Sequence, residues 1–464
     1  MSSTSPAPAP VATNPRSRVI FASLIGTSIE FYDFYVYATA AVLVFPALFF
    51  PSADPTVSLL SSFAAFGAAF VARPIGSIVF GHFGDRIGRK GTLVASLLTM
   101  GIATVLIGCL PTALTPGWEI AAPTLLVIMR FAQGLGLGGE WSGAALLATE
   151  NAPAGKRAIY GTFPQMGAPI GFIAANGVFL FLAVTLSPEE FQSWGWRVPF
   201  LASALLVAVG LYVRFKLIET PAFQKVVETG EVAKVPLARV FQTSWREVIL
   251  GTFIMLATYT LFYLMTTFTL TYGTTAKSAA DAAAAAEAAG KPFNADAFVP
   301  GLGIARNDFL VMLIVAVVFF GIFTLVSGPL AEKFGRRSHL IVTTLGIIAF
   351  GGLFVPLLAG GLVGVNALLI IGFILMGLTF GPMGALLPEL FPTNVRYTGS
   401  AISYNVASIL GAAVAPFIAV ALWQAANGST YFVGLYLSAM GLITLVALVL
   451  STETRDVEYT QRVS

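Results

Sequence analysis

The chain has 464 residues, of which 57% are hydrophobic and only 10% are charged, and its formal net charge is +3 at pH 7. A soluble globular domain carries about 25% charged residues, so this composition indicates a membrane protein. Nothing in the small net charge supports a nucleic-acid partner. The single cysteine, Cys109, excludes an intramolecular disulfide and a cysteine metal cluster.

The chain begins with a polar segment and continues with apolar runs. Residues 1–18 are rich in Ser, Thr, Ala and Pro, which predicts a disordered cytoplasmic tail without a cleavable signal peptide. Each apolar run is long enough to cross about 30 Å of hydrocarbon. The runs must be helices, because lipid cannot satisfy an exposed backbone. The twelve predicted spans are 19–45, 59–81, 91–111, 121–149, 159–184, 198–218, 248–272, 308–330, 340–360, 365–390, 400–425 and 430–451.

Two longer connections interrupt the apolar runs. Residues 219–247 contain two prolines and alternating charges, and they predict a cytoplasmic linker between an N-terminal half (19–218) and a C-terminal half (248–451). Residues 273–306 predict an Ala-rich outer loop that can form a short helix. Residues 452–464 predict a second cytoplasmic tail.

The distribution of basic residues predicts the orientation in the membrane. With the N-terminus in the cytoplasm, 19 of the 25 Lys and Arg count as cytoplasmic, including Arg214 and Lys216 at the cytoplasmic end of the sixth span, while four fall in outer segments and two, Arg73 and Arg130, deep within spans. Cytoplasmic loops of membrane proteins carry such an excess. Both termini are therefore expected in the cytoplasm.

Two motifs each occur twice in the chain. Residues 81–90 (GHFGDRIGRK) recur 247 positions later as residues 328–337 (GPLAEKFGRR). The pattern Glu-x-x-Pro-x-x-x-Arg begins at Glu150 and again at Glu389, an offset of 239. Two motifs in the same order at similar offsets indicate a duplicated membrane protein. The predicted fold is an all-α membrane protein with twelve transmembrane helices in two pseudo-symmetric six-helix bundles.

These motifs resemble those of the major facilitator superfamily, and within it those of the metabolite:proton symporter family. The resemblance implies the fold of that superfamily, a bacterial inner (plasma) membrane and the proton as coupling ion, with no other cofactor. We expect a small-molecule substrate, contact with the lipid bilayer and function as a monomer. The resemblance depends on the two loop copies and on four further motifs: R-x-x-Q-G-x-x-x-G at 130–138, EFYDF at 30–34, WGWRVPF at 194–200 and PELFP at 388–392. Two other segments, FGHFGD at 80–85 and GAALL at 143–147, are most similar to shikimate-type members.

Ionisable side chains inside spans are costly, so each predicts a function or a partner. Glu30 and Asp33 share a helix face, and two carboxylates so close in a low dielectric favour holding a proton. Asp33 is expected to meet Arg130, while Glu30, Arg73 and Glu140 form a second cluster. Spans 3, 6, 9 and 12 are expected to carry no interior charge. We predict that Glu30, Asp33, Arg130 and Glu140 couple protons, the alternative being static ion pairs between helices.

The charges of the repeated motifs predict latches that close the cytoplasmic side. An acid and a base recur together in each copy, and ion pairs between them would have to break for that side to open. The alternative is that they only fix the topology. His82 and His339 are expected in solvent at loop ends. The predicted gating residues are Asp85, Arg89, Glu150, Arg157, Glu332, Arg336, Glu389 and Arg396.

The substrate cavity is expected between the two halves, near the middle of the membrane. Each polar side chain there has an alternative role as a helix–helix hydrogen bond. The Gly-rich stretch 134–139 predicts a close helix crossing, because no strand precedes it as in a phosphate loop. The predicted substrate-binding residues are Tyr37, Arg130, Gln133, Gln165, Tyr259, Tyr263, Tyr404 and Asn405.

The sequence favours a proton-coupled importer of a small polar metabolite that works by alternating access. An arginine in the cavity favours an organic anion, such as shikimate or another hydroxy, aromatic or keto acid. One alternative substrate is a proline/betaine-type osmolyte, and export is a third possibility. A membrane enzyme would need a catalytic set and a non-transporting sensor would need a signalling domain. The sequence shows neither, so we expect no enzymatic activity.

Overall fold

The computed structural model describes residues 16–52, 54–87, 89–215, 236–288, 293–295, 298–392 and 395–457. The description of side chains leaves out residues 16, 18, 19, 81–90, 93 and 236.

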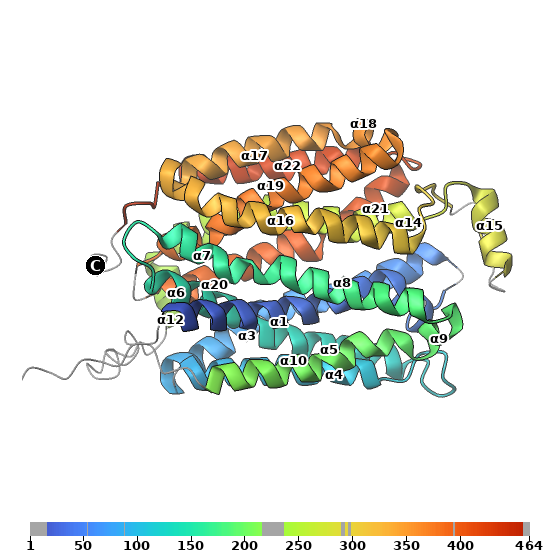
Figure 1. Cartoon of the computed structure of the whole chain (residues 1–464), viewed down its shortest axis with the longest axis horizontal. Helices are drawn as coiled ribbons and strands as arrows, with labels where there is room; N and C mark the ends of the chain where they lie inside the picture. Colours follow the sequence, from blue (N-terminus) through green and yellow to red (C-terminus); the bar gives the residue numbers. More distant parts are fainter. Residues whose placement is uncertain are drawn as a thin grey trace, which may run out of the picture.

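Long helices lie side by side in two bundles, the blue-to-green helices forming one and the yellow-to-red helices the other (Figure 1). Six rods of the N-terminal half are α1 (Arg16–Leu43), α3 (Pro55–Ile87), α4 (Arg89–Cys109), α5 (Ala121–Leu137) with α6 (Glu140–Glu150), α7 (Arg157–Gln165) with α8 (Gly167–Thr185), and α10 (Val198–Phe215).

The C-terminal half repeats this arrangement, and two of its rods contain a π-helical turn. Its six rods are α13 (Trp245–Tyr263) with η2 (Leu264–Phe268) and α14 (Thr269–Thr274), α16 (Arg306–Phe334), α17 (Arg336–Gly352) with α18 (Phe354–Ala359), α19 (Gly361–Glu389), α20 (Arg396–Ser408) with η3 (Ile409–Ala413) and α21 (Ala415–Ala425), and α22 (Tyr431–Leu450). The short connecting helices are α2 (Phe45–Leu48), α9 (Pro188–Ser193), η1 (Gly195–Arg197), α12 (Pro236–Thr243) and α15 (Ala279–Ala288).

The surface pattern is that of a protein in lipid. In the described part of the chain, nine helical segments are long and apolar enough to cross a membrane, and α1, α4 and α17 lie alongside them in the bundle. Large apolar side chains point outward, including Phe181 at 63%, Leu205 at 70% and Val342 at 70% exposure. The predicted all-α fold with twelve spans is confirmed.

The two ends of the bundle differ in what they carry. We call the end where α1 begins and α22 ends the termini side, and the opposite end, from which α15 projects, the α15 side (Figure 1). The helices extend beyond the apolar runs: α1 begins at Arg16, inside the predicted tail, and α3 continues to Ile87, well into the first repeated motif. Their ends can be polar, because they lie outside the hydrocarbon. Most of the linker and residues 458–464 lie outside the described residues.

Glycines set the approach of α5 to α3. A Cβ atom at Gly134 would meet backbone atoms of Ala69, and one at Gly138 would meet the backbone of Arg73. Small residues allow helix backbones to come this close. The Gly-rich stretch 134–139 therefore makes the predicted close crossing, and it fixes the positions of the charged side chains on both helices.

We expect Gly134→Val to lower the thermal stability of the detergent-solubilised protein more than Gly67→Val does. The added side chain at Gly134 meets the Ala69 backbone, whereas nothing lies within 4 Å of a Cβ at Gly67. Overpacking of this kind costs about 1–3 kcal/mol. The unfolding midpoints of both variants provide the measurement, and equal midpoints would contradict the role given to this crossing.

Candidate transport site

Two small cavities lie between the halves. The first, of about 20 Å³, is lined by Arg73 and is called here the Arg73 cavity. The second, of about 10 Å³, is lined by Asn176 and is called the Asn176 cavity. Each has room for about one water molecule. Tyr35, Phe262 and Tyr263 line both cavities and form an aromatic wall between them, with ring centroids 5.4 Å apart for Tyr35–Phe262 and 5.2 Å apart for Phe262–Tyr263.

Arg73 is the charged side chain of the Arg73 cavity. Its Nη2 atom lies 3.9 Å from Oε1 of Glu30, and its Nε donates to Oδ1 of Asn405 at 3.1 Å. The guanidinium carbon lies 5.4 Å from the ring centroid of Tyr404, a cation–π distance. The full lining is Phe31, Phe34, Tyr35, Arg73, Ala168, Met255, Tyr259, Phe262, Tyr263, Met376, Phe380 and Tyr404.

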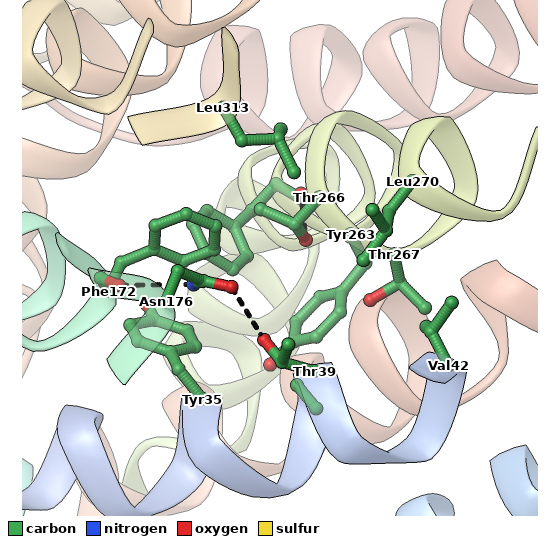
Figure 2. A pocket seen from close by; sticks show the side chains of 12 residues that line it. Tyr35, Thr39, Val42, Phe172, Asn176, Tyr263, Thr266, Thr267, Leu270 and Leu313 are labelled. Atoms are coloured by element: carbon green, nitrogen blue, oxygen red, sulfur yellow. Dashed lines mark hydrogen bonds between the residues drawn. The ribbon is translucent and has the colours of Figure 1, made fainter. Parts of the chain in front are cut away.

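The Asn176 cavity is lined mainly by apolar surface with a few hydroxyl and amide groups, and its lining contains no acidic or basic side chain. Figure 2 shows α1 below, Asn176 and Phe172 on α8 to one side, and the threonines of η2 opposite. The Thr39 hydroxyl donates to Oδ1 of Asn176 at 2.8 Å, and Nδ2 of Asn176 donates to the Phe172 carbonyl at 3.0 Å. The full lining is Tyr35, Ala38, Thr39, Val42, Phe172, Asn176, Phe262, Tyr263, Thr266, Thr267, Leu270 and Leu313.

Asp33 and Arg130 are linked through other side chains instead of meeting directly. Nη1 of Arg130 donates to Oε1 of Gln133, and Nε2 of Gln133 donates to the Thr104 hydroxyl at 2.8 Å. The hydroxyls of Thr104 and Ser203 donate to the two carboxylate oxygens of Asp33 at 3.1 Å and 2.5 Å. The predicted Asp33–Arg130 contact is thus absent from the described structure. These five residues are called the Asp33 relay.

An aromatic cage explains why Arg130 does not reach Asp33. The guanidinium carbon of Arg130 lies 4.5, 4.1 and 4.9 Å from the ring centroids of Phe34, Tyr37 and Phe66. Cation–π attraction at these distances stabilises a desolvated arginine by about 2 kcal/mol or more. Nη2 of Arg130 has no hydrogen-bond partner in the described chain, and the Tyr37 hydroxyl also lacks one. Both residues are fully buried.

The second predicted cluster exists and contains an extra arginine. Glu30 faces Arg73, as described above, and Glu140 forms an ion pair with Arg214 of α10. The expectation that span 6 carries no interior charge is wrong, because Arg214 is only 7% exposed. The sequence analysis assigned Arg214 to the cytoplasmic end of its apolar run. Glu140, inside the fourth span, was expected to share the single cation Arg73 with Glu30, and this excess of acid was the signal that a further cation had to approach it.

Three of the eight predicted substrate-binding residues line a cavity: Tyr259, Tyr263 and Tyr404. Tyr37, Arg130 and Gln133 belong to the cage and the relay, and they line neither the Arg73 cavity nor the Asn176 cavity. Gln165 accepts from Nε1 of Trp141 and donates to the Phe380 carbonyl, both at 2.8 Å, and it thereby joins the halves. The residues that the sequence analysis missed are Arg73, which it placed in the charged cluster alone, and the cavity residues Thr39, Asn176, Thr266 and Thr267.

Asn405 joins the two halves on the termini side of the cavities. Its Nδ2 donates to the Ser77 hydroxyl at 2.6 Å and to the Gly138 carbonyl at 3.0 Å. Nearby, the Tyr397 hydroxyl donates to the Gly139 carbonyl. The predicted substrate contact of Asn405 is replaced here by an interaction that closes this side.

The second copy of the repeated motif forms an ion-pair cluster. Arg336 contacts Glu332 at 2.8 Å and Glu389 at 3.3 Å. Oε1 of Glu332 also accepts from the backbone N–H of Ala158 at 2.6 Å, at the start of α7 in the other half. A carboxylate at a helix N-terminus is favourable. These contacts join the two halves on the termini side and are called the Glu332 latch, while their predicted gating role stays a prediction.

The segment after α22 reinforces this latch, a role that the sequence analysis did not predict. Both carboxylate oxygens of Glu453 accept from backbone N–H groups at the start of α17, at 2.8 and 3.1 Å. Thr454 donates to Glu389 at 2.7 Å, and Nη1 of Arg157 donates to the Val457 carbonyl at 2.5 Å. Residues 451–457, called the C-terminal strap, therefore contact both halves. Gly335, between α16 and α17, has φ 91°, a conformation that favours glycine.

The other predicted gating residues have mixed outcomes. Nε of Arg396 donates to the Phe391 carbonyl at 3.2 Å, within its own turn. The side chains of Asp85 and Arg89 lie outside the described residues, and the gating role of Glu150 stays a prediction. His339 is buried, with Nε2 2.8 Å from the Leu378 carbonyl oxygen, so its expected exposure to solvent is wrong.

Contacts also close the α15 side. Nε2 of Gln424 on α21 donates to the Thr56 hydroxyl on α3 at 2.7 Å. Arg306, at the start of α16, lies 5.1 Å from the ring centroid of Phe191 in α9. With both ends joined, neither cavity holds more than about one water molecule. A substrate can enter only after one set of these contacts opens.

Two six-helix halves with cavities between them and contacts that join them at both ends are the architecture of a membrane transporter. A family model described as sugar (and other) transporter matches residues 19–248 and 299–463. The chain belongs to this family of the major facilitator superfamily. It is a multi-pass transporter of the metabolite or sugar type, and not an enzyme.

Relatives support this assignment over nearly the whole chain. The Escherichia coli inner membrane metabolite transport protein YhjE is 58% identical, with 95% of each chain covered. The E. coli shikimate transporter is 33% identical, with 98% of each chain covered. The Salmonella typhimurium proline/betaine transporter is 31% identical, with 93% of this chain and 83% of the relative covered.

The fold has a counterpart among solved structures. The proton:xylose symporter XylE superposes with a TM-score of 0.72 at 18% identity, and 95% of this chain and 96% of that one are covered. This similarity shows the major facilitator fold.

We expect Glu332→Ala to make the termini side open more often. A reporter, Ala385→Cys in a Cys109→Ser background, tests this, because Ala385 is buried against Ala158 and Ala331 under the latch. Loss of a hydrogen bond to a charged group costs about 1.5–3 kcal/mol, so maleimide labelling should accelerate about tenfold or more. Glu287→Ala on α15 is the control, and equal labelling rates in both variants would contradict the latch.

Proposed function

We propose that the chain imports a small organic anion together with protons, by alternating access of the central cavity. The observation that carries this proposal is Arg73, a buried cation that lines a cavity between the two halves. Its nearest carboxylate, Glu30, lies at the loose distance of 3.9 Å. A substrate carboxylate can therefore replace Glu30 as the partner of Arg73, and rings such as Tyr259 and Tyr404 can pack against its carbon skeleton.

Asp33 is suited to carry the proton. Its partners in the relay are the hydroxyls of Thr104 and Ser203, and within the described chain it has no ion pair. A hydroxyl can donate to a carboxylate or accept from a carboxylic acid, so these partners serve both protonation states. The relay connects Asp33 to Arg130, so the charge on Asp33 influences how firmly Arg130 stays in its cage. Glu30 and Glu140 are further candidates for proton binding, and we infer no cofactor besides the proton.

The orientation and assembly belong to the same proposal. The excess of Lys and Arg in loops of the termini side supports a cytoplasmic location for that side. The Glu332 latch and the C-terminal strap then form the inner gate, and the Gln424–Thr56 contact belongs to the outer gate. We infer that a monomer in the bacterial plasma membrane carries out transport, because both halves of the cavity come from one chain.

A zwitterionic osmolyte is the second candidate substrate. The pair of Arg73 and Glu30 offers a cation and an anion within 3.9 Å of each other, which suits a carboxylate and an ammonium group of one small molecule. One relative carries the name proline/betaine transporter. An anionic substrate would displace Glu30 from Arg73, whereas a zwitterion would bind between them.

Uptake into proteoliposomes with an imposed pH gradient tests the proposal. The panel consists of radiolabelled shikimate, protocatechuate, 2-oxoglutarate, citrate, proline and betaine. We expect gradient-driven accumulation of one or more acids that a protonophore abolishes. Accumulation that resists the protonophore or needs sodium would overturn proton coupling, and uptake of proline or betaine alone would favour the second candidate.

We expect Asp33→Asn to exchange substrate in counterflow but to fail in uphill accumulation. Asparagine keeps the hydrogen bonds and resembles the protonated acid, so the step that releases the proton is lost. The pH dependence of counterflow between pH 5.5 and 8 should become flat. Glu119→Gln, at an exposed carboxylate, is the control with wild-type behaviour. Full gradient-driven accumulation by Asp33→Asn would show that another group carries the proton.

We expect Arg73→Lys to weaken the binding of an acid substrate about 10-fold to 100-fold. A lysine keeps the charge but cannot bind a carboxylate with two parallel hydrogen bonds, and one hydrogen bond to a charged group contributes about 1.5–3 kcal/mol. Equilibrium binding of the acid that the wild type accumulates provides the measurement. Arg239→Lys, on the exposed face of α12, should bind like the wild type. Wild-type affinity in Arg73→Lys would show that the carboxylate binds elsewhere, with Arg130 as the next candidate.

A further inference from the structure

The Asn176 cavity combines a mainly apolar lining with a few uncharged polar groups. Aromatic rings from both halves form its sides, and Thr39, Asn176, Thr266 and Thr267 supply its polar atoms (Figure 2). Its lining contains no acidic or basic side chain. An ion would therefore find no countercharge in this cavity. A neutral hydroxyl group would find hydrogen-bond donors and acceptors.

Several polar atoms of this cavity have unused hydrogen-bonding capacity. Nδ2 of Asn176 uses one of its two N–H donors, on the Phe172 carbonyl. The hydroxyls of Thr267 and Tyr263 make no hydrogen bond within the described chain, although both residues are buried. A polar group without a hydrogen-bond partner in a mainly apolar surrounding is unfavourable. A ligand with hydroxyl groups would satisfy these atoms, and an apolar ligand would leave them unsatisfied.

The aromatic wall separates this cavity from the Arg73 cavity. Tyr35, Phe262 and Tyr263 contact both cavities, so a shift of these rings would join the two spaces. Tyr263 is the last residue of α13 and directly precedes the π-helical turn η2, which carries Thr266 and Thr267. Such turns occur frequently at functional sites and mark places where a helix can change its course.

We infer that the two cavities are the two ends of one substrate chamber, and that Asn176 and Thr267 bind hydroxyl groups of an acid whose carboxylate lies at Arg73. The inference rests on the proposed function and specifies its substrate class as hydroxylated carboxylates. Acids of the same shape without hydroxyl groups are discriminated against, because they leave the polar atoms of the Asn176 cavity unpaired. Sites built to hydrogen-bond a hydroxyl reject analogues that lack it far more strongly than apolar pockets reject a missing methylene.

Matched pairs of acids test this inference on the full-length purified protein. One pair is shikimate and 1-cyclohexene-1-carboxylate, which share the ring and double bond, and another is gluconate and hexanoate. Ligand-induced changes in tryptophan fluorescence give the equilibrium dissociation constants. For at least one pair, we expect the hydroxylated acid to bind the wild type at least tenfold more tightly.

Two variants probe the hydroxyl site separately. Thr267→Val removes a hydroxyl that has no partner in the described chain, so it should disturb folding little, and Asn176→Leu removes the amide. Each should reduce the affinity ratio of the pair at least threefold. Thr274→Val is the matched control, because its hydroxyl donates to the Leu270 carbonyl and lines neither cavity. Its ratio should equal that of the wild type.

The outcomes separate this inference from the proposed function. Binding of acids without a preference for the hydroxylated member, or a ratio that Thr267→Val leaves unchanged, would overturn the hydroxyl site alone. Proton-driven uptake would then still support the proposed function. Failure of every acid to bind would overturn both.

Discussion

The cost of burying charge inside a membrane bundle determines how the N-terminal half is built. A guanidinium or carboxylate in a low dielectric needs partners that replace water. Arg130 obtains them from three aromatic rings and Gln133, and Arg214 obtains them from Glu140. Because these partners come from different helices, α1, α3, α5, α6 and α10 must pack in one register. The glycines of α5 and its C-terminal cap support the same packing, because they let the backbone of α5 come close to that of α3.

The two halves contribute different chemistry to the central region. Glu30, Asp33, Arg73, Arg130 and Glu140 all come from the N-terminal half, whereas the C-terminal half supplies tyrosines, threonines and two π-helical turns. The buried charges of the central region and the two π-helical turns therefore lie in different halves. Arg73 connects the two roles, since it lines a cavity and also binds Asn405 of the C-terminal half. Substrate at Arg73 would thus compete with a contact that joins the halves.

The fold could be predicted from sequence because every segment that crosses lipid must be a helix with an apolar stretch as long as the hydrocarbon is thick. Apolar length marks the helices, and the repeated motifs mark the two halves. The charged cluster around Glu30 and Glu140 was predictable for the same reason, since each buried charge demands a partner. The position of Arg214 was missed because an arginine at the end of an apolar run can lie in either environment.

The residues around the cavities were harder to predict. Thr39, Asn176 and Thr267 look like ordinary polar residues of membrane helices, and only the packing of α1 and α8 against η2 brings them together. Gln165 and Asn405 are also uncharged polar residues of membrane helices, but their side chains join the two halves instead of lining a cavity. The C-terminal strap was not predicted because the Glu453 carboxylate accepts from backbone N–H groups and the Val457 carbonyl accepts from Arg157, and contacts with the backbone leave no pattern in the sequence.

The aromatic wall has a consequence for energy conservation by the cell. In this conformation the Arg73 cavity and the Asn176 cavity are separate, and each has room for about one water molecule. A proton crosses a membrane protein readily along an unbroken file of water, and the rings of Tyr35, Phe262 and Tyr263 lie between these two spaces. While these rings stay in place, the two cavities share no continuous file of water through which protons could run down a gradient.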